Sequence, residues 1–182
     1  QQRFGQRDHR YRCCCDHRNA GFRYPIATSD PGSYNSTVMA LSPISYWRLG
    51  ETITGPLVDS GAIGNDAVNN GIVLNEPGAI NGDGNGAIHV DTPGYIEIAH
   101  DPAYALDNGT VQMWFKVESI GGVQTLFSKD ATTFGSGGHL NISVENSGQV
   151  HVRLQSAGSD NTVTSPSAVG AGQRYHLAFS FG

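Results

Sequence analysis

Several short segments of the chain alternate between apolar and polar residues, a period of two that is typical of β-strands with one buried face. The longest is 109–119, GTVQMWFKVES, and another closes the chain at 173–181, QRYHLAFSF. Between them, 138–156 alternates twice around the turn Asn146-Ser147-Gly148, which predicts a β-hairpin. Shorter strand candidates are 44–51, 86–91, 95–100 and 123–129.

Helical periodicity is confined to the start of this region. Residues 34–41, YNSTVMAL, can form one or two helical turns before Pro43 ends them, and no later segment has a 3.6-residue period. The pattern predicts an all-β fold, a two-sheet antiparallel jelly-roll sandwich preceded by a mostly irregular N-terminal tail. Both tryptophans, Trp47 and Trp114, fall in predicted strands and are expected in the core.

Composition divides the chain at TSDPGS, residues 28–33, a cluster typical of a linker. Residues 1–33 form a basic, Cys-containing tail or linker, and residues 34–182 form the predicted sandwich. The adjacent cysteines Cys13-Cys14-Cys15 do not have the spacing of a zinc site. Residues 25–182 are acidic, which argues against a nucleic-acid partner, and no apolar run is long enough for membrane insertion.

The residues do not support catalysis. Acidic side chains are scattered singly along the chain, and neither a Gly-x-Ser-x-Gly elbow nor a His-Glu-x-x-His motif occurs. His176 is a conceivable general base, but alternation places it as a polar residue on a sheet face. We therefore expect that the protein is not an enzyme.

Two acidic, glycine-rich loops predict a Ca²⁺ site. The first, DSGAIGND, contains Asp59, Asn65 and Asp66, and the second, NGDGNG, contains Asp83. Calcium prefers six to eight oxygen ligands from carboxylates, amides and backbone carbonyls, which flexible loops of this composition provide. The alternative is that these are ordinary turn residues, since Asp, Asn and Gly favour turns.

A sugar-binding site would combine an aromatic ring with polar hydrogen-bonding groups. The candidate residues are Phe134, flanked by Asp130 and His139 in the segment 130–139, and Tyr95. The alternative for Phe134 is packing within its own loop.

The order of several motifs carries a family resemblance. These are VMALSPISYWRLGE, VDSGAIGNDA, GDGNGAIHVDTPGYIEI, GTVQMWFKV, QTLFSKD, GGHLNISVENSGQVHVRLQ and RYHLAFSFG. Over about residues 34–182, this series resembles the laminin-G-like modules of the concanavalin A-like lectin/glucanase superfamily, in the form found in bacterial surface and secreted proteins and phage tail proteins.

The resemblance implies a module that is incomplete at its C-terminus, because the hairpin and final strand that follow YHLAFSF in this family are absent. It also implies a structural calcium, for which one ligand often comes from that C-terminal part. The Glu-x-Asp-x-x-Glu strand of the family's laminarinase-type enzymes is not found.

The expected function is therefore a non-catalytic binding module for a carbohydrate or surface glycoconjugate, extracellular, cell-surface or on a phage virion. The alternatives are a structural or adhesion module that binds protein or spaces other domains, and an accessory domain of a glycoside hydrolase.

Overall fold

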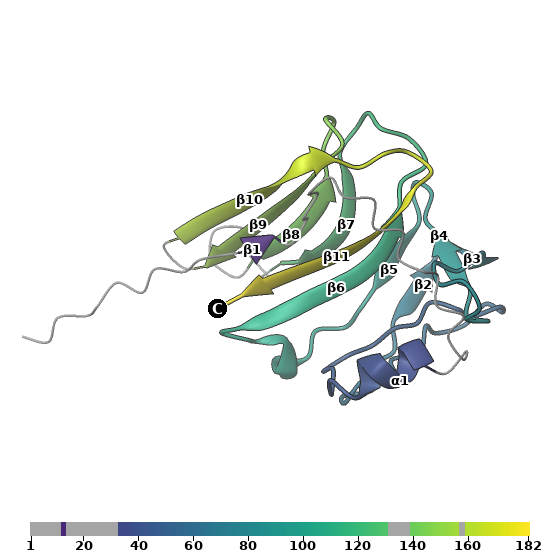
Figure 1. Ribbon diagram of the computed structural model, residues 1–182. Helices are drawn as coiled ribbons and strands as arrows, with labels where there is room; N and C mark the ends of the chain where they lie inside the picture. Colours follow the sequence, from purple (N-terminus) through teal and green to yellow (C-terminus); the bar gives the residue numbers. More distant parts are fainter. Residues whose placement is uncertain (1–11, 14–32, 131–138, 157–158) are drawn as a thin grey trace, which may run out of the picture. The chain divides into compact units, whose positions relative to one another are not determined.

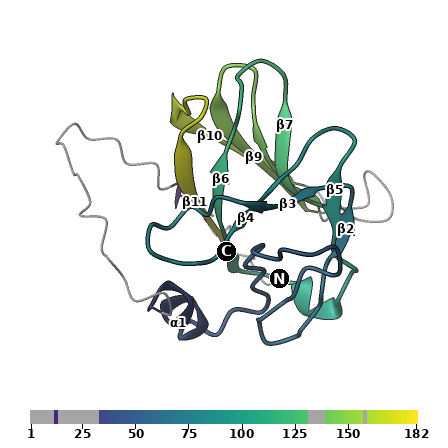
Figure 2. The ribbon, with the colours of Figure 1, turned by 90° about the vertical axis from the view of Figure 1, so that its right-hand side faces the viewer.

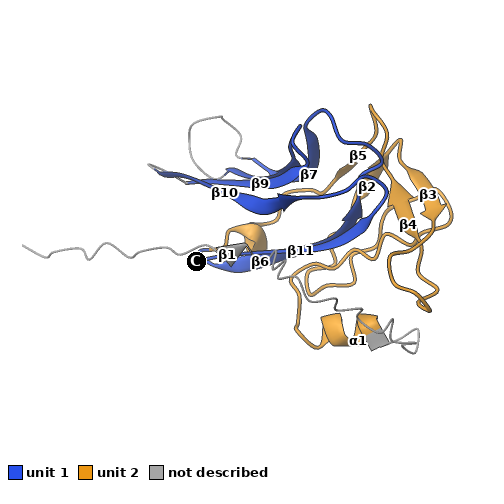
Figure 3. Cartoon of the chain, turned by 45° about the horizontal axis from the view of Figure 1, so that its top comes forward, with its two compact units in different colours: residues 1–19, 107–182 blue, residues 20–106 orange. Residues whose placement is uncertain are grey.

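The computed structural model describes residues 12–13, 33–130, 139–156 and 159–182 (Figure 1). The chain divides into two compact units (Figure 3). Unit 1 comprises residues 1–19 and 107–182, and unit 2 comprises residues 20–106. Among the described residues, no helix has both the length and the apolar character needed to cross a membrane.

Unit 1 consists of two antiparallel sheets, which form its two layers in Figure 3. The four-stranded sheet has the order β10-β9-β8-β7, and the three-stranded sheet has the order β1-β11-β6. The strands of the first sheet are β7 (Gln124–Lys129), β8 (His139–Val144), β9 (Gln149–Ser156) and β10 (Ser159–Ala168). Those of the second are β1 (Arg12–Cys13), β6 (Gly109–Lys116) and β11 (Arg174–Phe181).

The core of unit 1 lies between these two sheets. Ile142 and Val152, from the four-stranded sheet, form one cluster with Leu177 and Phe179 from β11. All four side chains are almost completely buried. A core shared by two antiparallel sheets confirms the predicted all-β sandwich, because each sheet buries one apolar face against the other.

The alternating segments of unit 1 form the strands that their pattern predicts. The hairpin of β8 and β9 turns at Gly148, whose φ of 80° is a conformation that glycine adopts without steric cost. β10 is a strand that the pattern did not reveal. Its sequence, SDNTVTSPSA, is polar, and its register with β9 shifts between Thr164 and Ala168, around Pro166.

Unit 2 contains short elements connected by long loops. The predicted helical turns at 34–41 are confirmed by α1 (Ser33–Met39). The strands pair as β2 with β5 and β3 with β4, as Figure 2 shows. The remaining bounds are β2 (Val68–Asn70), β3 (Val73–Glu76), β4 (Ala87–His89), β5 (Tyr95–Glu97) and the 3₁₀ turn η1 (Pro102–Tyr104).

The core of unit 2 is small. Leu57, Ala67 and Ile72 are buried, and Trp47 packs against them, as expected for this tryptophan. The indole Nε1 of Trp47 donates a hydrogen bond to the backbone oxygen of Asn65 at 3.0 Å, which satisfies its one polar atom.

Two sequence-based expectations are wrong. Residues 44–51 do not form a strand: they make one isolated bridge, Trp47 with Asp59, and Leu49 has a φ of 57°, which interrupts extended backbone. Trp114 is not a core residue, since 43% of its surface is exposed. It lies on the face of β6 opposite to Met113, where its ring packs against that of His176 with centroids 5.1 Å apart.

Candidate functional site

The outer face of the four-stranded sheet carries three rows of polar side chains that run across the strands. We call this surface the polar face. Its rows are Asp130, His139, Gln155 and Asp160; Ser128, Asn141, Arg153 and Thr162; and Thr125, Ser143, His151 and Thr164.

The alternation of β8 and β9 creates this surface. Leu140 and Ile142 point into the core, so Asn141 between them points to the opposite side of the sheet. The same phase places Arg153 and Gln155 of β9 on the polar face, on either side of Leu154, which packs against the core. One face of the sheet is thus apolar and the other consists of hydrogen-bonding groups.

Two ion pairs lie on the polar face. The guanidinium of Arg153 donates to both carboxylate oxygens of Asp160, from Nε at 3.0 Å and from Nη2 at 2.8 Å. This hydrogen bonding raises the pKa of Arg153 and lowers that of Asp160. In the second pair, Nδ1 of His139 lies 3.3 Å from Oδ1 of Asp130. Arg153 and Asp160 therefore hold one another in position, as do His139 and Asp130 when the imidazole is protonated.

Asn141 and Gln155 lie among these pairs on the two central strands. His139 faces Gln155 and Asn141 faces Arg153, so the two amides are diagonal neighbours in adjacent rows. Both residues are half-buried. Within the described part of the chain, neither side-chain amide has a hydrogen-bond partner. Each amide can both donate and accept, which leaves this part of the face able to bind a polar ligand.

The predicted sugar-binding residues are distributed over both units. Asp130 and His139 come together as an ion pair at the end of β7 and the start of β8. Phe134 lies outside the described residues. Tyr95 belongs to unit 2, where it faces Asn70 across β5 and β2 and is 53% exposed.

The first predicted calcium loop is organised around Asp59, which is 6% exposed. Its Oδ1 accepts the backbone N–H groups of Tyr46 at 2.6 Å and Gly61 at 2.7 Å, and its Oδ2 accepts that of Asn65 at 2.9 Å. Burial alone raises the pKa of Asp59, but these N–H groups outweigh it and hold the pKa below its usual value of 3.8. Asp66 contributes by accepting the N–H of Asp59 at 2.9 Å.

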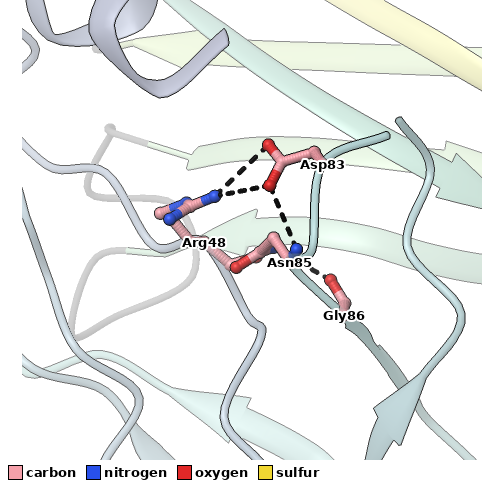
Figure 4. Close-up of polar contacts among 4 residues, drawn as sticks. All are labelled: Arg48, Asp83, Asn85 and Gly86. Atoms are coloured by element: carbon pink, nitrogen blue, oxygen red, sulfur yellow. Dashed lines mark hydrogen bonds and ion pairs between the residues drawn. The ribbon is translucent and has the colours of Figure 1, made fainter. Parts of the chain in front are cut away.

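In the second loop, Asp83 forms an ion pair with Arg48 (Figure 4). Nη2 of Arg48 lies 3.1 Å from one carboxylate oxygen and 3.3 Å from the other. The backbone N–H of Asn85 also donates to Asp83, and the Asn85 amide donates to the backbone oxygens of Arg48 and Gly86. These contacts connect the loop to the YWRLGE segment.

The carboxylates of both loops make hydrogen bonds within the protein. The carboxylate oxygens of Asp59 and Asp83, which would coordinate calcium, accept from N–H groups. In the described ranges, no group of three or more His, Cys, Asp or Glu side chains is placed to hold a metal ion. Calcium at these loops stays a prediction from the sequence.

Sequence reasoning identified only part of the polar face. It selected Asp130 and His139 but not Asn141, Arg153 or Gln155. The signal was present in 138–156, because the polar residues of an alternating hairpin share the face opposite to the core. The contribution of β10, including Asp160, had no comparable signal in its polar sequence.

Comparison with known proteins gives one match. Residues 90–182, 93 residues and just over half of the chain, match a laminin-G-type family model that is described as the concanavalin A-like lectin/glucanases superfamily. This range includes every residue of the polar face. No curated protein and no solved structure matches the chain.

Proposed function

The chain belongs to the concanavalin A-like lectin/glucanases superfamily, and from this premise we propose that it is a carbohydrate-binding module whose binding surface is the polar face. The family supports a binding or structural module. That the ligand is a carbohydrate is what we propose in addition.

The two free amides, Asn141 and Gln155, are the observation that carries the proposal. Sugar hydroxyls both donate and accept hydrogen bonds, and a side-chain amide offers two donors and an acceptor in one plane. The ion pairs Asp130–His139 and Arg153–Asp160 flank the amides. Their mutual contacts limit the side-chain entropy that would be lost on binding.

Binding without catalysis is the second part of the proposal. Its support is the separation of the two carboxylates on the face, which belong to opposite edges of the sheet. Asp130 follows β7 and Asp160 lies on β10, three strand spacings away, or roughly 14 Å at about 4.8 Å per strand. The paired carboxylates of glycosidases lie about 5 to 9.5 Å apart.

The test is to measure binding of the whole chain to a glycan array, followed by titration calorimetry with the best ligand. We expect Asn141→Ala and Gln155→Ala each to weaken binding about fivefold, because each loses about 1 kcal/mol of hydrogen bonding. The double variant should lose more than either single one.

Gln112→Ala is the matched control. Gln112 is also an amide in the middle of a strand, but it lies exposed on β6, in the other sheet. It should bind as the unchanged chain does. If no glycan binds, or if all three variants bind equally well, the proposal is wrong, and a protein-binding or spacer role becomes the better reading of the family.

A further inference from the structure

The guanidinium of Arg153 on the polar face is already satisfied by a carboxylate. Both Nε and Nη2 of Arg153 donate to Asp160, in the bidentate geometry that an anionic ligand would otherwise use. The ring of His139 faces Asp130 at 3.3 Å. An anionic sugar, with a sulfate or carboxylate group, would therefore have to displace one of these partners before it could pair with the protein.

The charge around the face also disfavours an anion. In its three rows, with His139 and His151 counted as neutral, two carboxylates, Asp130 and Asp160, stand against the one guanidinium of Arg153. The chain as a whole has a formal charge of −5, with histidine counted as neutral. A polyanion would meet repulsion as it approached, and this repulsion weakens as salt screens it.

Among the described residues, the groups left free on the face are uncharged. Asn141 and Gln155 lie at its centre, and the hydroxyls of Ser128 and Thr162 end the row that contains Asn141. Amides and hydroxyls pair with neutral hydroxyls without the desolvation cost that charged partners carry. The unpaired amides and hydroxyls and the paired guanidinium of Arg153 thus all favour an uncharged ligand.

We propose that the polar face selects uncharged glycans over anionic ones, and that Asp160 sets this specificity by neutralising Arg153. This inference rests on the proposed carbohydrate-binding function and names the substrate class of the same site. It makes Asp160 a specificity-determining residue that does not itself need to contact the sugar.

The experiment compares two sets of soluble polysaccharides in affinity electrophoresis. The neutral set is a β-glucan, a mannan, a galactan and a xylan, and the anionic set is heparin, polygalacturonate and alginate. The proteins are the unchanged chain, Asp160→Asn, and the double variant Asp160→Asn with Arg153→Gln. Glu118→Gln is the control, because it removes a carboxylate that pairs with Lys116 at 2.6 Å elsewhere in unit 1. Far-UV circular dichroism establishes that each variant is folded.

We expect the unchanged chain to bind a member of the neutral set at least tenfold more tightly than any anionic polymer. Asp160→Asn should raise affinity for the anionic set about tenfold, since Arg153 is then free for a charge-assisted hydrogen bond. High salt and the Arg153→Gln change should each remove this gain, and Glu118→Gln should not produce it.

Two results would overturn the inference, and they are distinguishable. Tighter binding of anionic polymers by the unchanged chain, or no gain in Asp160→Asn, would contradict the specificity while leaving carbohydrate binding in place. Failure of every polymer in both sets to bind the unchanged chain would remove the proposed function and, with it, the inference.

Discussion

Asp59 accepts the backbone N–H of Tyr46 at 2.6 Å, although the two residues are 13 positions apart in the chain. The same oxygen accepts from Gly61, and the other oxygen accepts from Asn65. One buried carboxylate thus satisfies three backbone donors in segments that lack regular secondary structure. In unit 2 this side chain accepts backbone N–H groups that would be paired between strands in a sheet.

Replacing Asp59 by Asn should therefore destabilise unit 2 by about 1 to 3 kcal/mol, because the amide nitrogen would face a backbone N–H. Urea unfolding measures this best in a Trp114→Phe background, where Trp47 is the one remaining tryptophan and reports on unit 2. Glu76→Gln is the control, since Glu76 is an exposed carboxylate of the same unit. Equal midpoints for the two variants would contradict the role of Asp59.

The pH dependence of stability should depend on the same carboxylate. Because the folded pKa of Asp59 is below its usual 3.8, its contribution is fully present above about pH 5 and is lost as the pH falls through 3.8 toward the folded value. The difference in unfolding free energy between the unchanged chain and Asp59→Asn should shrink over this range. A difference that stays constant down to about pH 3 would argue against ionisation as its source.

Two glycines of unit 2 should respond differently to alanine. A Cβ at Gly61 would lie 2.4 Å from the Cα of Ser45 and 2.6 Å from the backbone oxygen of Ile44, both of which are main-chain atoms. A Cβ at Gly55 would meet nothing within 4 Å. We expect Gly61→Ala to cost at least about 2 kcal/mol and Gly55→Ala to change stability by less than about 0.5 kcal/mol. Thermal melts of the pair, compared with the unchanged chain, test this directly.

His176 should make unit 1 sensitive to mild acid. Burial lowers its pKa below the usual 6.5, so the unfolded chain takes up a proton at a higher pH than the folded one. Stability should be constant above about pH 7.5 and should fall as the pH drops through 6.5. His176→Phe, which keeps a ring against Trp114, should flatten this dependence, and His100→Phe, at an exposed site in unit 2, should not. Melting temperatures between about pH 8 and pH 5 provide the measurement.

Calcium provides a further test of the acidic loops. Since Asp59 and Asp83 already have N–H partners, we expect the melting temperature in millimolar calcium to equal that in chelator. A rise specific to calcium, absent with magnesium, would instead mean that the loops rearrange to coordinate the ion by mass action on the folded state. That result would confirm the calcium site predicted from the sequence.

Alternation predicted the sandwich of unit 1 well because its strands bury one face and expose the other. Residues 138–156 show this clearly, with Leu140 and Ile142 buried on one side and Asn141 on the other. The polar face could have been predicted from the same residues had the polar positions been considered together.

Other parts of the chain have no alternation of apolar and polar residues that would predict their structure. β10 has one large apolar residue, Val163, opposite Val152, and only its pairing with β9 identifies it as a strand. In unit 2 the backbone is held by side chains such as Asp59 and Asp83, whose partners lie far away in sequence. The composition of these loops is the same for a calcium site and for a turn, so the sequence alone does not distinguish the two.

The shifted register of β10 affects how readily this edge of the sheet can pair with a strand of a second molecule. β10 is the last strand in the order of its sheet, and Pro166 lies where the pairing with β9 shifts. Proline offers no N–H to an incoming strand, and an irregular edge is a poor template for one. The part of this margin at 164–168 is therefore a poor template for the sheet of a second molecule.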